Sequence, residues 1–454
     1  QKLVGKSTHR QQSTNQDLVE SLVHRQHLAE LKNLLEQLHT GDIAYILEAL
    51  PFTDRMTLWQ LIKQERGGDV LLEVSEPVRE NLIDALSPED LMTTLNQMDA
   101  DDLAYIADEI PEEALHARQE TLTTDDQNWL RSALTYEEDT VGFLMSNEMV
   151  VVYETDTLEL AAKTLRSFAE LPIHNDQLFA VDRRGLLKGV LSLQTLLLKE
   201  PALPVQKVMS TDFVKFSPYD DASDASQAFE RYDLVSAPVV NERGKLIGRL
   251  TVDVVMDYIR EETTEDVLSM AGVSGEEDLF APILKSMQNR GLWLIVNLFA
   301  AIMISRIIGL FEGTITHIIA LAALMPIVAN IGGNTGNQTG ALIIRAITLG
   351  QINSKNTFYL VRKELCVSAL NGAVIGIIVG LFAYIVYQSL ALACVIALSM
   401  LLTLTVAALV GLAVPIVLEK IGRDPALGSS IITTAMADSF GFFIFLGLAS
   451  LFLV

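Results

Sequence analysis

The sequence predicts a multidomain membrane protein built from an all-α superhelical N-terminal domain, a tandem pair of small α/β domains and an α-helical membrane domain with five spans. Three observations support this fold class. Apolar residues recur at helical spacing in the first third, short β-branched segments repeat in the middle, and long apolar stretches fill the last third. With 454 residues, the chain is also too long for one ordinary domain.

The N-terminal domain is expected at residues 18–135, where apolar residues recur every three or four positions. The segment DIAYILEALP, which begins at Asp42, recurs sixty positions later as DLAYIADEIP, which begins at Asp102. A repeat of this length predicts stacked helical hairpins. We expect Asp42 and Asp102 to cap helices. A weak cation site around Asp102 is the alternative.

The middle region, residues 136–260, contains two copies of one pattern, at about 141–199 and 205–259. Gly185 and Gly189 in the first copy correspond to Gly244 and Gly248 in the second, both offset by fifty-nine residues. Each copy predicts a helix, a strand, a glycine turn, a strand and a helix. Two such units are expected to pack as a pseudosymmetric pair.

An acidic connecting helix is expected at residues 261–288, continuing a helical pattern that begins at Asp253. Its carboxylates lie three or four residues apart, so they occupy neighbouring turns of one side. A solvated face is the ordinary explanation for such a pattern. The helix lies in sequence between an acidic region and a membrane region, and this position favours a second explanation, a gate that responds to cations. The carboxylates are Asp257, Glu261, Glu262, Glu265 and Asp266.

The membrane domain is expected at residues 289–454, because spans need about 20 apolar residues. Four stretches qualify: 292–310, 357–387, 390–418 and 426–454. The fifth span contains the polar segment 330–339, which is tolerated at membrane depth only if it lines a cavity or is buried in protein. We therefore expect this segment to line the transport pathway. Arg306 is expected to snorkel or to pair with Glu312.

Asp438 is a carboxylate within the last apolar stretch. Placing a charge at the bilayer centre costs about 2.5–3.5 kcal/mol on insertion scales, so such residues usually face water, a partner or an ion. Asp438 is thus a candidate functional residue. A protonated or snorkelling aspartate that packs another helix is the alternative.

The net charge of −24 excludes a polyanion-binding function. Residues before 290 carry −27 and the remainder carries +3, so the soluble part repels nucleic acid and attracts cations. The N-terminal residues are polar and lack an apolar signal core, so we expect the soluble part to stay in the cytoplasm. Lys and Arg on that side of the spans then place the C-terminus outside.

The middle region resembles a tandem pair of CBS domains. Such pairs often bind adenosine nucleotides, with a Thr or Ser and an Asp after the last strand near the ribose. Thr251 and Asp253 match that pattern most closely, which makes ATP a candidate regulator. The ordinary alternative is a strand residue followed by a helix cap.

The whole chain resembles the MgtE family of magnesium channels. The resemblance rests on MPIVANIGGNTGNQ at residues 325–338, GRDP at 422–425 and the threonine pair before Asp438, in this domain order. It implies a homodimer with one pore on the twofold axis, in which Asp438 holds hydrated Mg²⁺. It also implies a pore wall and a plug helix that closes the pore when cytosolic Mg²⁺ bridges it to the other domains. The implied pore wall contains Gly333, Asn334, Asn337 and Thr434, and the implied cytosolic gating set contains Glu261, Glu262, Glu265, Asp266, Asp257, Asp253, Asp221, Asp224 and Asp102.

The sequence therefore predicts an inner-membrane Mg²⁺ channel rather than an enzyme, since the seven His are scattered and no catalytic constellation is present. The expected partners are a second copy of the chain, the lipid bilayer and the divalent cation. A transporter of Co²⁺ or another divalent cation remains one alternative, because carboxylate and amide oxygens bind several such ions. The other is a membrane-anchored nucleotide or ion sensor that conducts nothing.

Overall fold

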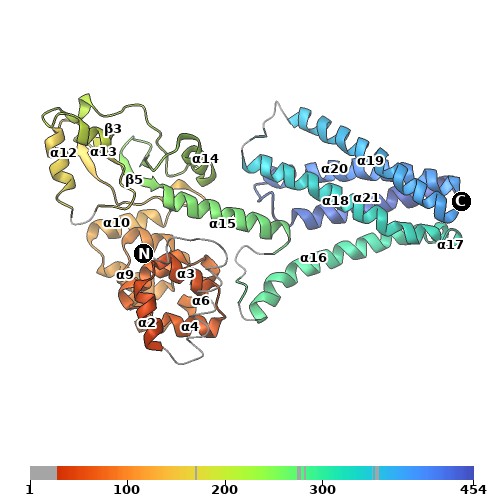
Figure 1. The fold of residues 1–454 in the computed structure, drawn as a ribbon, viewed down its shortest axis with the longest axis horizontal. Helices are drawn as coiled ribbons and strands as arrows, with labels where there is room; N and C mark the ends of the chain where they lie inside the picture. Colours follow the sequence, from red (N-terminus) through yellow and green to blue (C-terminus); the bar gives the residue numbers. More distant parts are fainter. Residues whose placement is uncertain (1–27, 169–170, 274–277, 281–282, 350, 353–356) are drawn as a thin grey trace. The chain divides into compact units, whose positions relative to one another are not determined.

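The computed structural model describes residues 28–454 except 169–170, 274–277, 281–282, 350 and 353–356. The chain forms two compact units. The first comprises residues 1–261 together with 278–281, and the second comprises residues 262–277 together with 282–454. Figure 1 shows the helices and strands of both units.

The N-terminal domain is all-helical, as the apolar spacing predicts, and its helices recur at the predicted offset of sixty residues. Helix α3 (Thr40–Glu48) corresponds to α8 (Ala100–Tyr105), and α4 (Phe52–Trp59) corresponds to α9 (Glu112–Thr121). One buried apolar core joins both halves. The superhelical arrangement remains a prediction. The other helices are α2 (Leu28–Gln37), α5 (Gly67–Glu73), α6 (Glu76–Ala85), α7 (Pro88–Leu95) and α10 (Thr124–Ala133), with 3₁₀ turns η1 (Gln64–Arg66) and η2 (Ala107–Glu109).

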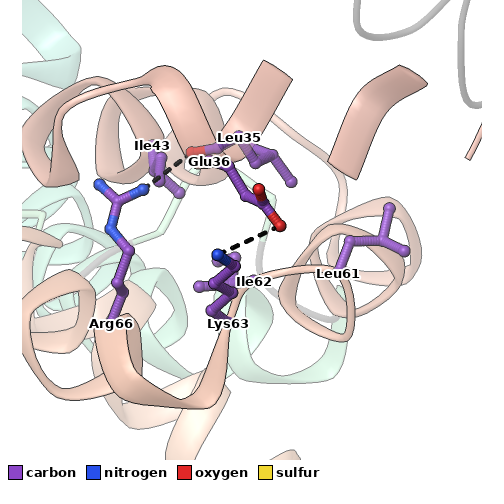
Figure 2. A pocket seen from close by; sticks show the side chains of 7 residues that line it. All are labelled: Leu35, Glu36, Ile43, Leu61, Ile62, Lys63 and Arg66. Carbon is purple, nitrogen blue, oxygen red and sulfur yellow. Dashed lines mark hydrogen bonds and ion pairs between the residues drawn. The ribbon is translucent and has the colours of Figure 1, made fainter. Parts of the chain in front are cut away.

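Arginine side chains cap the carbonyl ends of the first helix in each half. Arg66 donates to the carbonyl oxygens of Leu35 at 2.8 Å and Leu38 at 2.6 Å. Figure 2 shows the Leu35 bond, beside the Lys63–Glu36 ion pair at the same surface. In the second half, Arg118 donates to the equivalent carbonyls of Leu95 and Met98, each at 2.8 Å. A guanidinium at a helix C-terminus satisfies carbonyls that have no intrahelical partner.

The predicted helix caps need a correction in detail. Asp42 and Asp102 lie in the first turns of α3 and α8, while the N-cap residues are His39 and Asp99. The Asp102 carboxylate accepts from the backbone N–H of Asp99, which is the reverse bond of a capping box. The repeat therefore marks the third helical position rather than the cap.

The middle region contains two α/β units whose glycine turns correspond as predicted. Gly185 and Gly244 both have positive φ, at 79° and 74°, and each turn accepts a hydrogen bond from the chain just beyond the other turn. Strands β1 (Val151–Tyr153), β2 (Gln177–Val181) and β3 (Leu187–Ser192) form one sheet, and β4 (Ser236–Val240) and β5 (Leu246–Thr251) form another. Strands β2 and β3 pair antiparallel, as do β4 and β5. The remaining elements are α11 (Val141–Leu144), α12 (Leu158–Leu165), α13 (Leu193–Leu198), η3 (Val205–Lys207) and α14 (Ala222–Tyr232).

Helix α15 (Val252–Met270) follows β5 without a loop. It covers less of the expected connecting segment 261–288 than one continuous helix would, because the chain turns at Gly272, whose φ is +70°. The next helix, α16, begins at Ile283. The acidic segment is thus the second half of a helix that begins in the α/β pair.

The membrane region contains α16 (Ile283–Gly309), α17 (Glu312–His317), α18 (Ala320–Thr348), α19 (Thr357–Tyr387), α20 (Leu390–Lys420) and α21 (Ser429–Phe452). Four helices among the described residues, α16, α19, α20 and α21, are long and apolar enough to cross a membrane. Helix α18, the fifth predicted span, has 29 residues and continues unbroken through the polar segment 330–339. At 1.5 Å per residue it is about 43 Å long, so the five-span arrangement remains a prediction that its length permits. Arg306 and Glu312 are both exposed.

Glycines let α18, α20 and α21 pack closely, and these helices lie side by side in Figure 1. A Cβ on Gly336 would lie 2.7 Å from Thr433 Cγ2 and 3.3 Å from the carbonyl oxygen of Ala407. A Cβ on Gly411 would overlap the carbonyl oxygen of Gly336, which belongs to the backbone of the neighbouring helix. The glycines of the polar segment therefore allow close helix packing, and the amide side chains of Asn330, Asn334 and Gln338 in the same segment are exposed.

Replacing Gly411 with Ala should destabilise the membrane region. Overpacking of a tight contact typically costs about 1–3 kcal/mol, and here α18 and α20 must separate to admit the methyl group. Thermal unfolding of the purified chain in detergent would measure the loss. Gly291→Ala is the matched control, because no atom lies within 4 Å of its added Cβ. Equal melting temperatures for G411A and the unmodified chain would contradict this packing.

Candidate metal centre

The membrane region brings four of the predicted pore residues together at the contact between α18 and α21. A Cβ on Gly333 would lie 3.4 Å from Thr434 Cγ2 and 3.8 Å from Asp438 Oδ1. Asn337 Nδ2 donates to Thr434 Oγ1 at 3.1 Å. Gly333 and Asn337 lie one helical turn apart, as do Thr434 and Asp438. Two polar turns from different helices therefore face each other.

Two acceptor oxygens at this contact, Asp438 Oδ1 and Asn337 Oδ1, are buried and have no hydrogen-bond partner among the described residues. Because the Asn337 amide donates to Thr434, its oxygen stays available as an acceptor. Leaving a buried acceptor unsatisfied typically costs about 1–3 kcal/mol, and more for a charged group. Both oxygens suit a ligand that donates hydrogen bonds or carries positive charge.

Asn334 lies on a different side of α18 from the Asp438 contact. It is exposed, and its Nδ2 donates to Asn330 Oδ1 at 3.2 Å. Gln338, one turn further along, is exposed as well. These amides form a polar stripe on a membrane helix, next to the glycines that contact α20 and α21.

Sequence reasoning missed Thr403, whose hydroxyl is buried between α18, α20 and α21. Its Oγ1 has no hydrogen-bond partner in the described part of the chain. Cβ atoms added to Gly332 or Gly441 would lie 3.0 and 3.1 Å from its Cγ2. Thr403 lies in an apolar stretch with no motif, so the pattern of neighbouring residues could not have identified it.

Glu261, on α15, contacts the N-terminal domain within the first unit. Tyr105 OH donates to Glu261 Oε2 at 3.3 Å, and the Arg79 guanidinium lies 5.1 Å from the centre of the Tyr105 ring. Arg79 also forms a 2.7 Å ion pair with Glu109. Burial raises the pKa of Glu261, while Arg79 and the Tyr105 hydrogen bond lower it. The carboxylate is thus held by protein groups, while its side chain stays exposed to water.

Two other α15 carboxylates face charged groups of the first unit. Burial and the nearby Asp257 raise the pKa of Glu73, and burial also raises the pKa of Asp257 itself. Asp253 Oδ2 lies 3.8 Å from His174 Nε2. The N-terminal domain and α15 therefore share a surface on which like charges meet.

The second half of α15 belongs to the second unit, where it contacts the start of α21. The backbone N–H of Gly428 donates to the carbonyl oxygen of Ser269 at 2.9 Å. Burial and the neighbouring Asp424 raise the pKa of Asp266. Glu262 and Glu265 lie on the same half of the helix.

Trp293 of α16 fits between two glycines that sequence reasoning did not single out. A Cβ on Gly428 would overlap the Trp293 ring, and a Cβ on Gly272 would lie 3.4 Å from Trp293 Cγ and overlap Ile431 Cδ1. Both glycines have positive φ, at 60° and 70°. This wedge joins the end of α15 to the first turns of the helix that carries Asp438.

The remaining members of the predicted cytosolic set lie on different elements of the first unit. Asp221 is the N-cap of α14, accepting from Ser223 N–H at 2.8 Å, and Asp224 lies in the first turn of that helix. Asp102 lies in α8, where burial and the nearby Asp101 raise its pKa to about 7. Within the described residues, no group of three or more His, Cys, Asp or Glu side chains is placed to hold a metal ion.

The candidate nucleotide residues lie at the junction of β5 and α15. Thr251 is buried at the end of the strand, and Asp253 Oδ1 is buried with no hydrogen-bond partner within the described residues. An unsatisfied acceptor after the last strand fits a donor such as a ribose hydroxyl.

Family models match three parts of the chain. The MgtE model, described as a divalent cation transporter, matches residues 325–448, and a model of the MgtE intracellular N domain matches residues 38–139. A CBS domain model matches residues 205–261. These matches contain the α18–α21 contact, the N-terminal domain from α3 onward and the first half of α15.

Full-length relatives are also similar. The magnesium transporter MgtE of Thermus thermophilus is 30% identical over 93% of this chain and 95% of its own, and that of Bacillus subtilis is 29% identical over 94% of both chains. A crystal structure of the cytosolic domain of the Mg²⁺ channel MgtE in complex with ATP covers 53% of this chain and 98% of its own, at 28% identity and a TM-score of 0.48.

Asp102 should make the stability of the protein depend on pH. Its pKa is near 7 in the folded chain and near 3.8 when unfolded, so the folded state binds more protons between these values. Stability should therefore fall as the pH rises from about 4 to 7. We expect the full chain, free of divalent cations, to melt at a higher temperature at pH 5.5 than at pH 7.5, and Asp102→Asn to reduce that difference. A pH response that is unchanged in the Asp102→Asn variant would show that other groups cause it.

Proposed function

The chain belongs to the MgtE family of divalent cation transporters, and on that basis we propose that it forms a homodimeric Mg²⁺ channel whose pore contains Asp438 and whose opening is controlled by cytosolic Mg²⁺. The family is one of magnesium transporters and not of enzymes. The dimeric pore and the control by Mg²⁺ are the parts that we propose.

One observation carries the pore proposal: Asp438 Oδ1 and Asn337 Oδ1 are buried acceptors without partners at the same helix contact. Mg²⁺ sheds its water reluctantly and is usually bound through one or two carboxylates while it keeps several waters. A hydrated Mg²⁺ presents many water O–H donors and a double positive charge. It would satisfy an isolated carboxylate and an amide oxygen at once.

A second copy of the chain would complete the site. The chain offers a single carboxylate at this contact, and a twofold axis beside α18 and α21 would supply another. The exposed amides of Asn330, Asn334 and Gln338 support this placement, because a membrane helix that exposes amides needs water or another protein surface there. We propose that this stripe faces the pore and the second copy.

Selectivity for Mg²⁺ over Co²⁺ follows from the ligand chemistry in this proposal. The contact contains carboxylate, amide and hydroxyl oxygens, which suit hard cations that remain hydrated. Co²⁺ gains from nitrogen and sulfur ligands, and the residues at the contact provide neither. A pore that binds the hydrated ion would distinguish the two mainly by hydration.

Cytosolic control is proposed to act through α15. Glu73 and Asp257 meet where the N-terminal domain contacts α15, and Asp266 meets Asp424 where α15 contacts the membrane region. Like charges that lie close together repel, and a bound cation relieves that repulsion. Mg²⁺ would therefore favour the arrangement in which α15 is held at both ends. ATP at Thr251 and Asp253 is proposed as a further regulator.

The proposed location is the inner membrane, with the acidic domains in the cytoplasm and the C-terminus outside. This orientation places the basic residues Arg345, Arg362, Lys363, Lys420 and Arg423 on the cytoplasmic side. The acidic sensor would then face the compartment whose Mg²⁺ it reports.

Asp438→Asn should lower Mg²⁺ flux at least tenfold, because the variant keeps the shape of the side chain and removes its charge. Uptake into proteoliposomes containing the purified chain would measure the effect, with Co²⁺ flux recorded in parallel. Ser439→Ala is the matched control, since that hydroxyl only bonds to Ala435 of its own helix. Normal Mg²⁺ flux in D438N would refute the pore assignment, and an unmodified chain that carries no divalent cation would favour a sensor.

Neutralising Glu261, Glu262, Glu265 and Asp266 together should raise the cytosolic Mg²⁺ concentration that half-closes the channel about tenfold or more. Patch recordings with Mg²⁺ varied on the cytosolic side would measure it. The control variant neutralises four exposed acidic residues of the N-terminal domain, Glu112, Glu113, Glu120 and Asp125. If both quadruple variants close at the same Mg²⁺ concentration, the gating proposal fails.

A further inference from the structure

Asp278, which lies in sequence between α15 and α16, is buried in the N-terminal domain. Its exposed fraction is 7%, and it forms an ion pair with Arg55, which is fully buried. Arg55 Nη1 donates to Asp278 Oδ2 at 2.7 Å, and Nη2 donates to Oδ1 at 3.3 Å. The pair therefore has the two-pronged geometry that fits a guanidinium to a carboxylate.

The Asp278 carboxylate has a full set of hydrogen-bond donors. Asn81 Nδ2 donates to Oδ2 at 3.3 Å, and the backbone N–H of Phe280 donates to Oδ1 at 2.9 Å. Together with the two Arg55 bonds, this gives two donors to each oxygen. A carboxylate offers about four lone-pair sites, so all are used.

The N-terminal domain provides the receptor for this carboxylate from three of its helices. Arg55 lies in α4, Asn81 lies in α6, and the Arg55 Nε donates to the carbonyl oxygen of Leu47 in α3 at 2.9 Å. Within the described residues, Asp278 is the one carboxylate that pairs with Arg55. Without it, a fully buried guanidinium would keep a single carbonyl partner, which is strongly unfavourable.

We propose that this receptor, formed by Arg55, Asn81 and the Leu47 carbonyl, is an intramolecular docking site for residues 278–280, and that docking couples the N-terminal domain to the pore. The N-terminal domain then holds both ends of residues 262–277. It binds the residue before them, Glu261, through Tyr105, and the residue after them, Asp278, through Arg55. This inference rests on the proposed channel function for its effect on gating, while the docking itself does not.

Docking at both ends makes the N-terminal domain a clamp on the gating segment. When cations draw the N-terminal domain onto α15, the Asp278 contact carries the same displacement to the start of α16. A clamp released at one end transmits less of the binding energy, so closure requires more Mg²⁺. The receptor binds a carboxylate and not the cation, which separates it from the gating carboxylates.

The test compares Asp278→Asn with the unmodified full-length chain. Asn keeps the size of the side chain but removes its charge, and we expect the Mg²⁺ concentration for half-closure to rise at least about fivefold, with unchanged single-channel conductance. Hydrogen exchange of the full chain should quicken at residues 278–280 and in α4. Asp84→Asn is the matched control, because Asp84 is an exposed carboxylate of the helix that carries Asn81.

A second variant keeps the test decisive if Asp278→Asn perturbs folding. Arg55→Met removes the buried charge, and the double variant with Asp278→Asn should be shifted no further than the single variants, since both remove one interaction. Additive shifts would overturn the proposal, as would exchange and Mg²⁺ closure in D278N equal to those of the D84N control. If the unmodified chain conducts no Mg²⁺, the proposed function fails, and the exchange data still decide whether Asp278 docks.

Discussion

A carboxylate oxygen removed from water needs positive charge or several donors, and the buried oxygens of Asp278 and Asp438 meet that need differently. Asp278 receives a guanidinium, an amide and a backbone N–H from its own chain. Asp438 lies among helices that supply no donor to its buried oxygen. The first arrangement fixes a segment in place, and the second leaves a position for a cation that can enter and leave.

Glycine packing makes the second arrangement possible. Gly336 and Gly411 bring α18 and α20 into backbone contact. Gly333 lets α18 lie against Thr434 and Asp438 of α21. The polar segment of α18 thus packs closely through its glycines on one side and exposes its amide side chains on another. At the far end of α15, Trp293 fits against Gly272 and Gly428, which links that helix to the beginning of α21.

Much of this was predictable from sequence where a local pattern has one physical meaning. The sixty-residue repeat, the paired glycine turns and the lone Asp438 all follow from spacing or from the cost of burying charge. Contacts between segments that are distant in sequence could not be predicted from these patterns. Asp278 is one acidic residue among many, and nothing near it in sequence indicates Arg55, 223 positions away. The predicted helix N-caps were wrong because a repeat gives the spacing between equivalent helices but not the first residue of each helix.

The central claim is that two copies of Asp438 share one cation pathway. Single-channel recording of chains co-expressed with their Asp438→Asn variant tests this claim most directly, because mixed assemblies form alongside the pure ones. A shared pore predicts three conductance classes for Mg²⁺, one for each number of Asp438 carboxylates. Only two classes, equal to those of the separately expressed chains, would mean that each copy conducts alone and would contradict the account.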